Sequence, residues 1–183
     1  LLSSAPDIVL LLFTGAAGAA DPALTQWDVV LADAVVQHDM DSRPLFPRFT
    51  LPALNRAQLN PDTSWLRWAS TALAKAAQAG ELDGFGLPST GLIATGDRFI
   101  GDAAVLDALR EALPGLKAVE MEGAAVAQVA EQEGMPWLVL RVISDGADAS
   151  AAQSFGDFIQ MYDRRAWRLL QALLSRIEQA PER

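Results

Sequence analysis

Short apolar segments alternate with amphipathic ones along most of this chain. Runs rich in apolar and β-branched residues predict strands at residues 8–13, 27–37, 91–94, 117–121 and 137–143, the second being one strand or a bent pair. Apolar residues at helical spacing predict helices at residues 62–78, 102–113, 122–133 and 155–179. This alternation indicates an α/β fold with a mixed, mainly parallel twisted sheet flanked by helices.

Length, composition and net charge limit the class of protein and the partners that this chain can have. A chain of 183 residues suits one domain, residues 1–183, and its 51% hydrophobic content excludes a disordered chain. The net charge of -9 disfavours nucleic acid and anionic membranes as partners. With no cysteine, the chain has no disulfide, zinc–thiolate site or cysteine nucleophile, which is compatible with the cytoplasmic location that we expect. The first apolar run is too short to span a membrane, and Asp7 precedes it where a signal peptide carries basic residues.

Residues 39–61 are predicted to be irregular. Prolines interrupt any helix or central strand in this segment, at positions 44, 47, 52 and 61. A structureless stretch of this length in a compact domain is typical of a lid, a binding loop or a contact with another subunit.

Polar residues follow the predicted strands where a ligand site is expected. In open α/β sheets, ligands bind at the carboxyl ends of the strands. The chain places there the glycine-containing segments 14–18 and 95–100, the residues Glu120, Met121 and Glu122, and then Arg141, Ser144 and Asp145. The sequence therefore predicts a site with three carboxylates, one arginine and two glycine-rich turns.

Each of these features also has a structural interpretation. Glu122 would place a favourable charge at a helix N-terminus. Arg141 lies inside an apolar strand, so it needs a carboxylate partner such as Glu120 or Glu122. Asp145 suits an Asx turn. Segment 14–18 lacks the spacing of a dinucleotide-binding loop and suits a simple tight turn equally well.

Two other site types are disfavoured. The aspartates at 39 and 41, and those at 145 and 148, do not follow the calcium-loop pattern and are expected to be solvated, so we predict no metal site. His38 is the sole histidine, and the chain has no G-x-S-x-G motif, which argues against a serine hydrolase.

Five motifs together resemble one known family. In chain order they are TGAAG at 14–18, QHD at 37–39, TGDRFI at 95–100, VEMEGAA at 119–125 and RVISD at 141–145. Their order and spacing are similar to those of the purine nucleoside phosphorylase and nucleosidase superfamily, and most of all to its bacterial 5'-methylthioadenosine/S-adenosylhomocysteine nucleosidases. The likeness extends from about residue 8 to the last helix and implies a three-layer α/β/α fold.

The resemblance implies hydrolysis of the N-glycosidic bond of 5'-methylthioadenosine, S-adenosylhomocysteine or a related 5'-modified adenine nucleoside, without a metal or organic cofactor. Asp145 matches the acid that protonates adenine, and Ser144 would orient it. Phe99 would stack on the base, and the backbone of Ile100 would read the purine edge.

The sugar side follows from the same resemblance. Glu122 matches the residue that binds the ribose hydroxyls, and Met121 would pack beneath the sugar. Glu120 and Arg141 match a polar cluster near the attacking water, and Phe155 matches an aromatic residue that closes over the site. The implied catalytic residues are Asp145, Arg141 and Glu120, and the implied substrate-binding residues are Phe99, Ile100, Met121, Glu122, Ser144, Phe155 and Ala16.

Two departures from the family bear on the reaction. The glutamate that activates water in the family belongs to a region before residue 1, so the domain is expected to be incomplete at its N-terminus. Phosphorylases hold phosphate with an arginine and a serine where this chain has Phe13 and Ala16, which favours hydrolysis. A phosphorylase, a hydrolase of another purine nucleoside and a catalytically silent nucleoside-binding protein remain alternatives.

The resemblance also implies a homodimer. Residues 39–52, with Leu45, Phe46 and Pro47, match the part of the family that reaches the neighbouring subunit's 5' pocket. A small-molecule nucleoside and a second copy of the chain are thus the expected partners.

Overall fold

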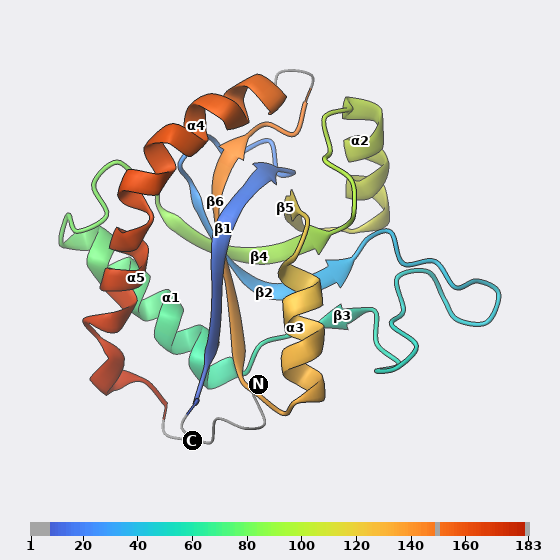
Figure 1. Cartoon of the computed structure of the whole chain (residues 1–183), viewed down its shortest axis with the longest axis horizontal. Coiled ribbons are helices and arrows are strands. Elements are labelled where there is room, and N and C mark those ends of the chain that lie inside the picture. Colours follow the sequence, from blue (N-terminus) through green and yellow to red (C-terminus); the bar gives the residue numbers. More distant parts are fainter. Residues whose placement is uncertain (1–7, 149–150, 182–183) are drawn as a thin grey trace.

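The computed structural model describes residues 8–148 and 151–181, and it confirms the alternation of strands and helices (Figure 1). The strands are β1 (Leu11–Ala19), β2 (Val29–Gln37), β3 (Gln58–Leu59), β4 (Pro88–Thr95), β5 (Leu116–Glu120) and β6 (Trp137–Asp145). The α-helices are α1 (Thr63–Gln78), α2 (Ala103–Ala112), α3 (Gly123–Gln132), α4 (Ala151–Arg165) and α5 (Trp167–Leu174), followed by the 3₁₀ turn η1 (Ile177–Gln179). In the described part of the chain, no helix is long and apolar enough to cross a membrane.

The sheet is mixed, as expected, but it is closed and not open. Its order is β3-β2-β4-β5-β1-β6, and a further antiparallel pairing of β2 with β6 joins the two sides into a barrel. The pairs β1/β6, β2/β4 and β4/β5 are parallel, and the other pairs are antiparallel. A register shift between Ala32 and Ala34 bends β2, so its first half pairs with β6 and its second half with β3. The expected twisted sheet in a three-layer arrangement is therefore corrected to a barrel with helices around it.

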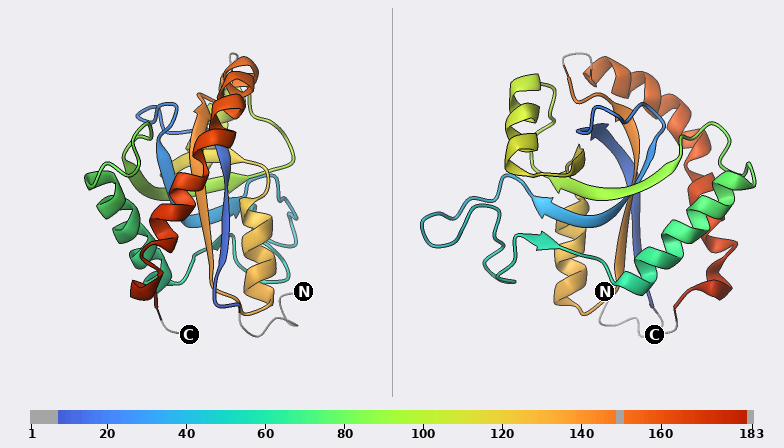
Figure 2. Two further views of the ribbon diagram at one scale, coloured as in Figure 1. Left: turned by 60° about the vertical axis from the view of Figure 1, so that its left-hand side comes forward. Right: turned by 180° about the vertical axis from the view of Figure 1, so that it is seen from behind.

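The helices lie around the barrel (Figure 2), and three apolar clusters attach them to it. Helices α1, α4 and α5 pack over one side of β6, whose Leu138, Leu140 and Val142 face them. The alternate residues Val139 and Ile143 belong to the cluster that includes the alanines of α3. Because β6 is buried on both faces, its residues 137–143 are apolar on both faces except for Arg141, and they do not alternate between apolar and polar. Helix α2 packs in a third cluster against β4 and β5.

Strand β1 differs from its prediction. Residues 14–18 were expected to form a turn, but they continue the strand and pair with β6 from Leu140 to Asp145. The small residues serve close packing instead: a Cβ on Gly15 would lie 2.6 Å from Nη1 of Arg141, and one on Gly18 would lie 2.9 Å from Cβ of Ala147. These glycines let β1 pass directly over the polar groups of β6.

The predicted C-terminal helix at 155–179 is also corrected. Helix α4 begins earlier, at Ala151, and ends at Arg165. A single residue, Ala166, separates it from α5. The two helices pack in the same apolar cluster as α1: Phe158 of α4 contacts Trp27 there, and Leu169 and Leu173 of α5 are buried in it. Because α4 begins at Ala151, Phe155, where the predicted helix begins, lies inside α4, on the side of the barrel where β1 and β6 end.

The long irregular segment is largely confirmed. Residues 38–57 contain no helix or named strand and form a loop that extends away from the barrel (Figure 1), with one isolated bridge between Leu51 and Arg56. The two-residue strand β3 lies within the predicted irregular range and pairs with the end of β2.

Candidate active site

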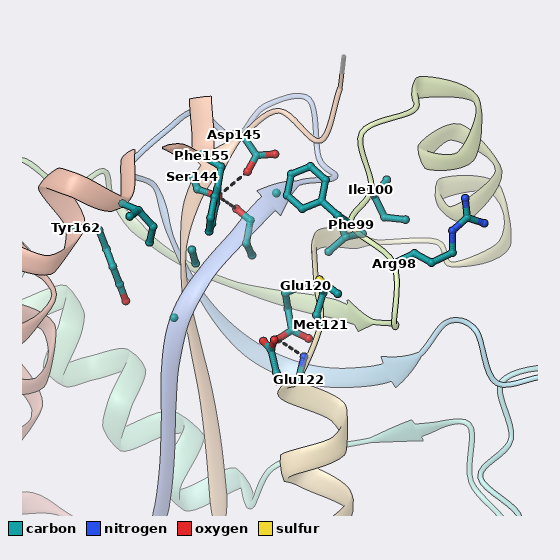
Figure 3. A pocket seen from close by; sticks show the side chains of 16 residues that line it. Arg98, Phe99, Ile100, Glu120, Met121, Glu122, Ser144, Asp145, Phe155 and Tyr162 are labelled. Carbon is teal, nitrogen blue, oxygen red and sulfur yellow. Dashed lines mark hydrogen bonds between the residues drawn. The ribbon is translucent and has the colours of Figure 1, made fainter. Parts of the chain in front are cut away.

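A pocket of about 310 Å³ lies where β1, β5, β6 and the segment after β4 meet, with α4 along its side (Figure 3). All of the predicted site residues except Arg141 line it. They are Ala16, Phe99, Ile100, Glu120, Met121, Glu122, Ser144, Asp145 and Phe155. Ligand pockets commonly combine this size with apolar walls and a few convergent polar groups.

Asp145 is the buried carboxyl at the end of β6. The hydroxyl of Ser144 donates to Oδ2 at 2.6 Å, and the backbone N–H of Ala147 donates to Oδ1 at 2.8 Å. The second bond is the Asx-turn contact that the sequence allowed as a structural interpretation. The carboxyl nevertheless borders the pocket, so the two bonds fix its orientation there.

Aromatic side chains form the walls beside this carboxyl. Phe99, 50% exposed, approaches Phe155 of α4 edge-to-face, with ring centroids 6.2 Å apart and planes at 72°. Tyr162, further along α4, stacks on Phe158 at 5.1 Å, and burial raises the pKa of its phenol. Flat apolar surfaces next to a carboxyl suit a planar heterocycle that can accept a proton.

Glu120 is a buried carboxylate surrounded by donors. It accepts hydrogen bonds from the Thr95 hydroxyl, from Arg141, and from the backbone N–H groups of Glu122 and Gly123 at 3.2 and 2.8 Å. Two of its donors are thus N–H groups at the start of α3, where a negative charge is favourable. Glu120 joins β5, β6 and α3 at one point.

Glu122 differs from Glu120 in its surroundings. It occupies the N-cap position of α3 but makes no capping hydrogen bond with its side chain, which is 63% exposed. Its carboxylate lies 3.8 Å from Arg141 and borders the pocket. Glu122 therefore has the exposure that a ligand-binding carboxylate needs.

Arg141 lies behind the pocket and does not border it. Its side chain is 1% exposed, forms an ion pair with Glu120 and packs over the Phe13 ring at 4.4 Å. Its Nη1 lies against Gly15 and has no hydrogen-bond partner among the described residues. This geometry matches the structural interpretation, in which Arg141 lies in an apolar strand and needs a carboxylate partner.

Two pocket residues of α4, Ile159 and Tyr162, were missed by the sequence reasoning. Phe155, Ile159 and Tyr162 recur at intervals of four and three residues, which places them on one face of a helix. That spacing was a usable signal once Phe155 had been singled out. Arg98 lies in segment 95–100, which the sequence places at the site, but the sequence assigns it no role.

The loop carboxylates considered as metal ligands have protein partners. Asp41 binds Arg43, which lowers the pKa of the carboxyl to about 2, and Asp39 accepts the N–H of Asp97. Among residues 8–148 and 151–181, no group of three His, Asp or Glu side chains could hold a metal ion.

His38 lies outside this pocket, buried against Gly96 at the end of β2. Its Nε2 has no hydrogen-bond partner in the described part of the chain, and burial lowers the pKa of the imidazole. The ring is therefore neutral at pH 7.

Comparison with known proteins agrees with this geometry. Residues 4–175 match the sequence model of the Phosphorylase superfamily. This chain belongs to the phosphorylase superfamily.

A 5'-methylthioadenosine/S-adenosylhomocysteine nucleosidase of Geobacillus kaustophilus is 37% identical over 175 residues, which are 95% of this chain and 70% of that protein. The nucleosidase structure from S. pneumoniae with the transition-state inhibitor MT-ImmA superposes with a TM-score of 0.83 at 32% identity, covering 96% of this chain and 73% of the other. Futalosine hydrolase of Helicobacter pylori superposes with a TM-score of 0.82 at 29% identity, covering 95% and 71%.

The Arg141–Glu120 pair generates a stability prediction. Arg141→Met leaves Glu120 buried without its cation, so we expect the free energy of unfolding to fall by about 3–5 kcal/mol. The double variant Arg141→Met with Glu120→Gln removes both charges and should lose less. Urea unfolding of the three proteins measures this, and a single-variant loss below about 1 kcal/mol would contradict the assigned burial of the pair.

A second prediction concerns pH. Because the pKa of His38 is lowered in the folded state, the unfolded chain takes up a proton near the ordinary value of 6.5 while the folded chain does not. Stability is therefore complete above pH 6.5 and falls as the pH drops below it, by at most about 1.4 kcal/mol per pH unit. Urea unfolding from pH 5 to 8 should show a steeper decline for the wild type than for His38→Asn; identical slopes would refute the neutral buried imidazole.

Proposed function

We propose that this protein hydrolyses the N-glycosidic bond of 5'-methylthioadenosine, S-adenosylhomocysteine or a related 5'-modified adenine nucleoside, and releases adenine. The observation that carries the proposal is the oriented carboxyl of Asp145 beside aromatic walls. The same pocket contains the exposed carboxylate of Glu122. The similar nucleosidases are named for this activity. All roles below are proposed on these grounds.

At the base, Asp145 donates a proton to N7 of adenine as the glycosidic bond breaks. A departing purine carries away the bonding electron pair, so protonation makes it a better leaving group. The Ser144 hydroxyl holds the carboxyl in one orientation. Phe99 stacks on the base, and the backbone of Ile100 reads its edge; Phe155 covers it from α4.

At the sugar, the transition state resembles an oxocarbenium ion, which carries positive charge on the ribose. Glu122 binds the ribose hydroxyls, and its negative charge favours the developing cation. Met121, 40% exposed, packs beneath the sugar, with Ala16 on the β1 side of the pocket.

Glu120 and Arg141 act as positioning residues in this proposal, which modifies the expected contact with the attacking water. Glu120 accepts the backbone N–H of Glu122 and thereby holds the residue that binds the ribose. Arg141 forms the buried ion pair that holds the Glu120 side chain in place.

Water is favoured over phosphate as the acceptor. Phe13 places an apolar ring under the Arg141 guanidinium, and Ala16 lines the pocket with a methyl group. Neither side chain can donate a hydrogen bond to a phosphate oxygen.

A homodimer in the cytoplasm completes the proposal. Leu45 is 84% exposed on the loop that extends from the barrel, where a second copy could cover it (Figure 2). Sedimentation should give twice the mass of the 19.6 kDa chain, and a monomer at micromolar concentration would contradict the dimer.

The reaction is tested by mixing the purified protein with 5'-methylthioadenosine, S-adenosylhomocysteine or futalosine in phosphate-free buffer and following the free base by chromatography. We expect adenine from the first two. Release only after phosphate is added would identify a phosphorylase. Adenine binding without release from any of these nucleosides would favour a nucleoside-binding protein.

Replacement of the proposed acid gives a sharper prediction. Asp145→Asn keeps the shape but cannot donate the proton, so we expect kcat to fall by about 100- to 10,000-fold. Retained adenine binding, measured by calorimetry, controls for folding. A kcat within threefold of the wild type would remove Asp145 from the mechanism.

A further inference from the structure

The segment Gln37, His38 and Asp39 has no part in the mechanism above, because none of these residues lines the pocket. His38 and Asp39 nevertheless contact residues 95–97, next to the pocket residues 98–100, and Gln37 contacts α3, which begins directly after the pocket residue Glu122. Nε2 of Gln37 donates to Oε1 of Gln128 on α3 at 2.8 Å, and the N–H of His38 donates to the carbonyl of Thr95 at 2.9 Å. The end of β2 is thus attached both to α3 and to the end of β4.

Asp39 holds the segment that follows β4. Its Oδ2 accepts the backbone N–H of Asp97 at 2.7 Å. The N–H of the preceding residue, Gly96, donates to the carbonyl of Glu120 at 3.1 Å. Two consecutive backbone N–H groups of this segment are therefore fixed: that of Gly96 by the carbonyl of Glu120 on β5, and that of Asp97 by the side chain of Asp39, just after β2.

The His38 ring packs against the first of these two residues, Gly96. A Cβ on Gly96 would lie 2.3 Å from both Cε1 and Nε2 of the ring, so only glycine allows this approach. The ring is 8% exposed, and its lowered pKa keeps it uncharged, which lets it lie against the backbone without a counter-ion. Asp39, Arg48 and Glu120 are the charged groups that act on it.

These contacts matter because residues 96–101 have no regular structure of their own. The segment, which we call the base loop, links Thr95 of β4 to the N-cap of α2, Asp102, whose side chain accepts the N–H of Ala104. It carries Phe99 and Ile100 into the pocket. With both ends anchored, the position of the Phe99 ring depends on where the loop leaves β4.

We propose that His38 and Asp39 are positioning residues that set the conformation of the base loop and thereby the affinity for the base. The identity of that base rests on the proposed function, whereas the positioning itself does not. The alternative is that Asp39 is an ordinary surface carboxylate whose bond to Asp97 has no consequence for the pocket.

Asp39→Ala tests the hydrogen bond. We expect KM for 5'-methylthioadenosine and Kd for adenine to rise about 3- to 10-fold, the range that corresponds to the loss of one hydrogen bond, with kcat within twofold of the wild type. Amide hydrogen exchange in peptides that cover residues 96–101 should become faster. Asp39→Asn keeps a side-chain oxygen that can accept the same N–H, so it should restore both readouts.

Asp62→Ala is the matched control. Asp62 caps α1 by accepting the N–H of Ser64 at 2.9 Å, which is the same kind of contact, and it does not line the pocket. Its loss should lower stability and leave KM and the exchange of residues 96–101 unchanged. A rise in KM that accompanies both alanine variants equally would mean that stability alone is responsible, and it would overturn the proposal.

The packing of His38 is tested by a double-mutant cycle. Gly96→Ala should raise Kd for adenine at least tenfold, because its methyl group collides with the ring. Adding His38→Ala removes the ring and makes room, so the double variant should bind adenine more tightly than the product of the single effects predicts. Strictly multiplicative effects would show that the two residues act independently, against the proposal.

Failure of the proposed function is distinguishable from failure of this inference. If the wild type releases no adenine, the proposed reaction is wrong. The hydrogen exchange rates of the base loop in Asp39→Ala, Asp39→Asn and Asp62→Ala can still be compared. Unchanged exchange in Asp39→Ala would overturn the positioning role whatever the protein catalyses.

Discussion

The rest of the site depends on one buried ion pair, Arg141 with Glu120. A guanidinium in the middle of β6 has no access to water, so it is tolerated only with a carboxylate at hydrogen-bond distance. That carboxylate comes from the last residue of β5 and also accepts the first N–H groups of α3. The pair therefore decides how β5, β6 and α3 meet, and with them where Glu122 stands.

The same pair accounts for the unusual composition of β1. This strand runs parallel to β6 with Gly15 next to Arg141, where a side chain on Gly15 would collide with the guanidinium. Phe13, two residues earlier and on the same face, instead lies flat against the charge. Residues 14–18, which the sequence suggested were a glycine-rich turn, thus form part of a strand that has small side chains where it lies against a buried charge.

Closure of the sheet gives the pocket its shape. In an open sheet, the ends of β4 and β6 would lie apart along one edge, whereas pairing of β2 with β6 curls them around a common opening. Asp145 from β6, Glu120 from β5 and the base loop after β4 then face one another within a single cavity. The loop at 38–57 starts at the same end of the barrel, directly beside the base loop that His38 and Asp39 contact.

The positions of most strands and helices could be predicted from the sequence. Strands buried on both faces are rich in apolar residues, as β6 is apart from Arg141 and its last two residues, and the helices keep apolar residues at helical spacing. The sequence also determined which polar residues converge, since they follow the strands in order and match a family pattern; Asp145 and Phe99 were found in this way. The tertiary structure alone decided the closed sheet, the break at Ala166 and the burial of Arg141 behind the pocket. The closed sheet depends on the bend in β2, and the burial of Arg141 depends on Glu120, 21 positions away in the chain; local sequence does not encode contacts between such distant residues.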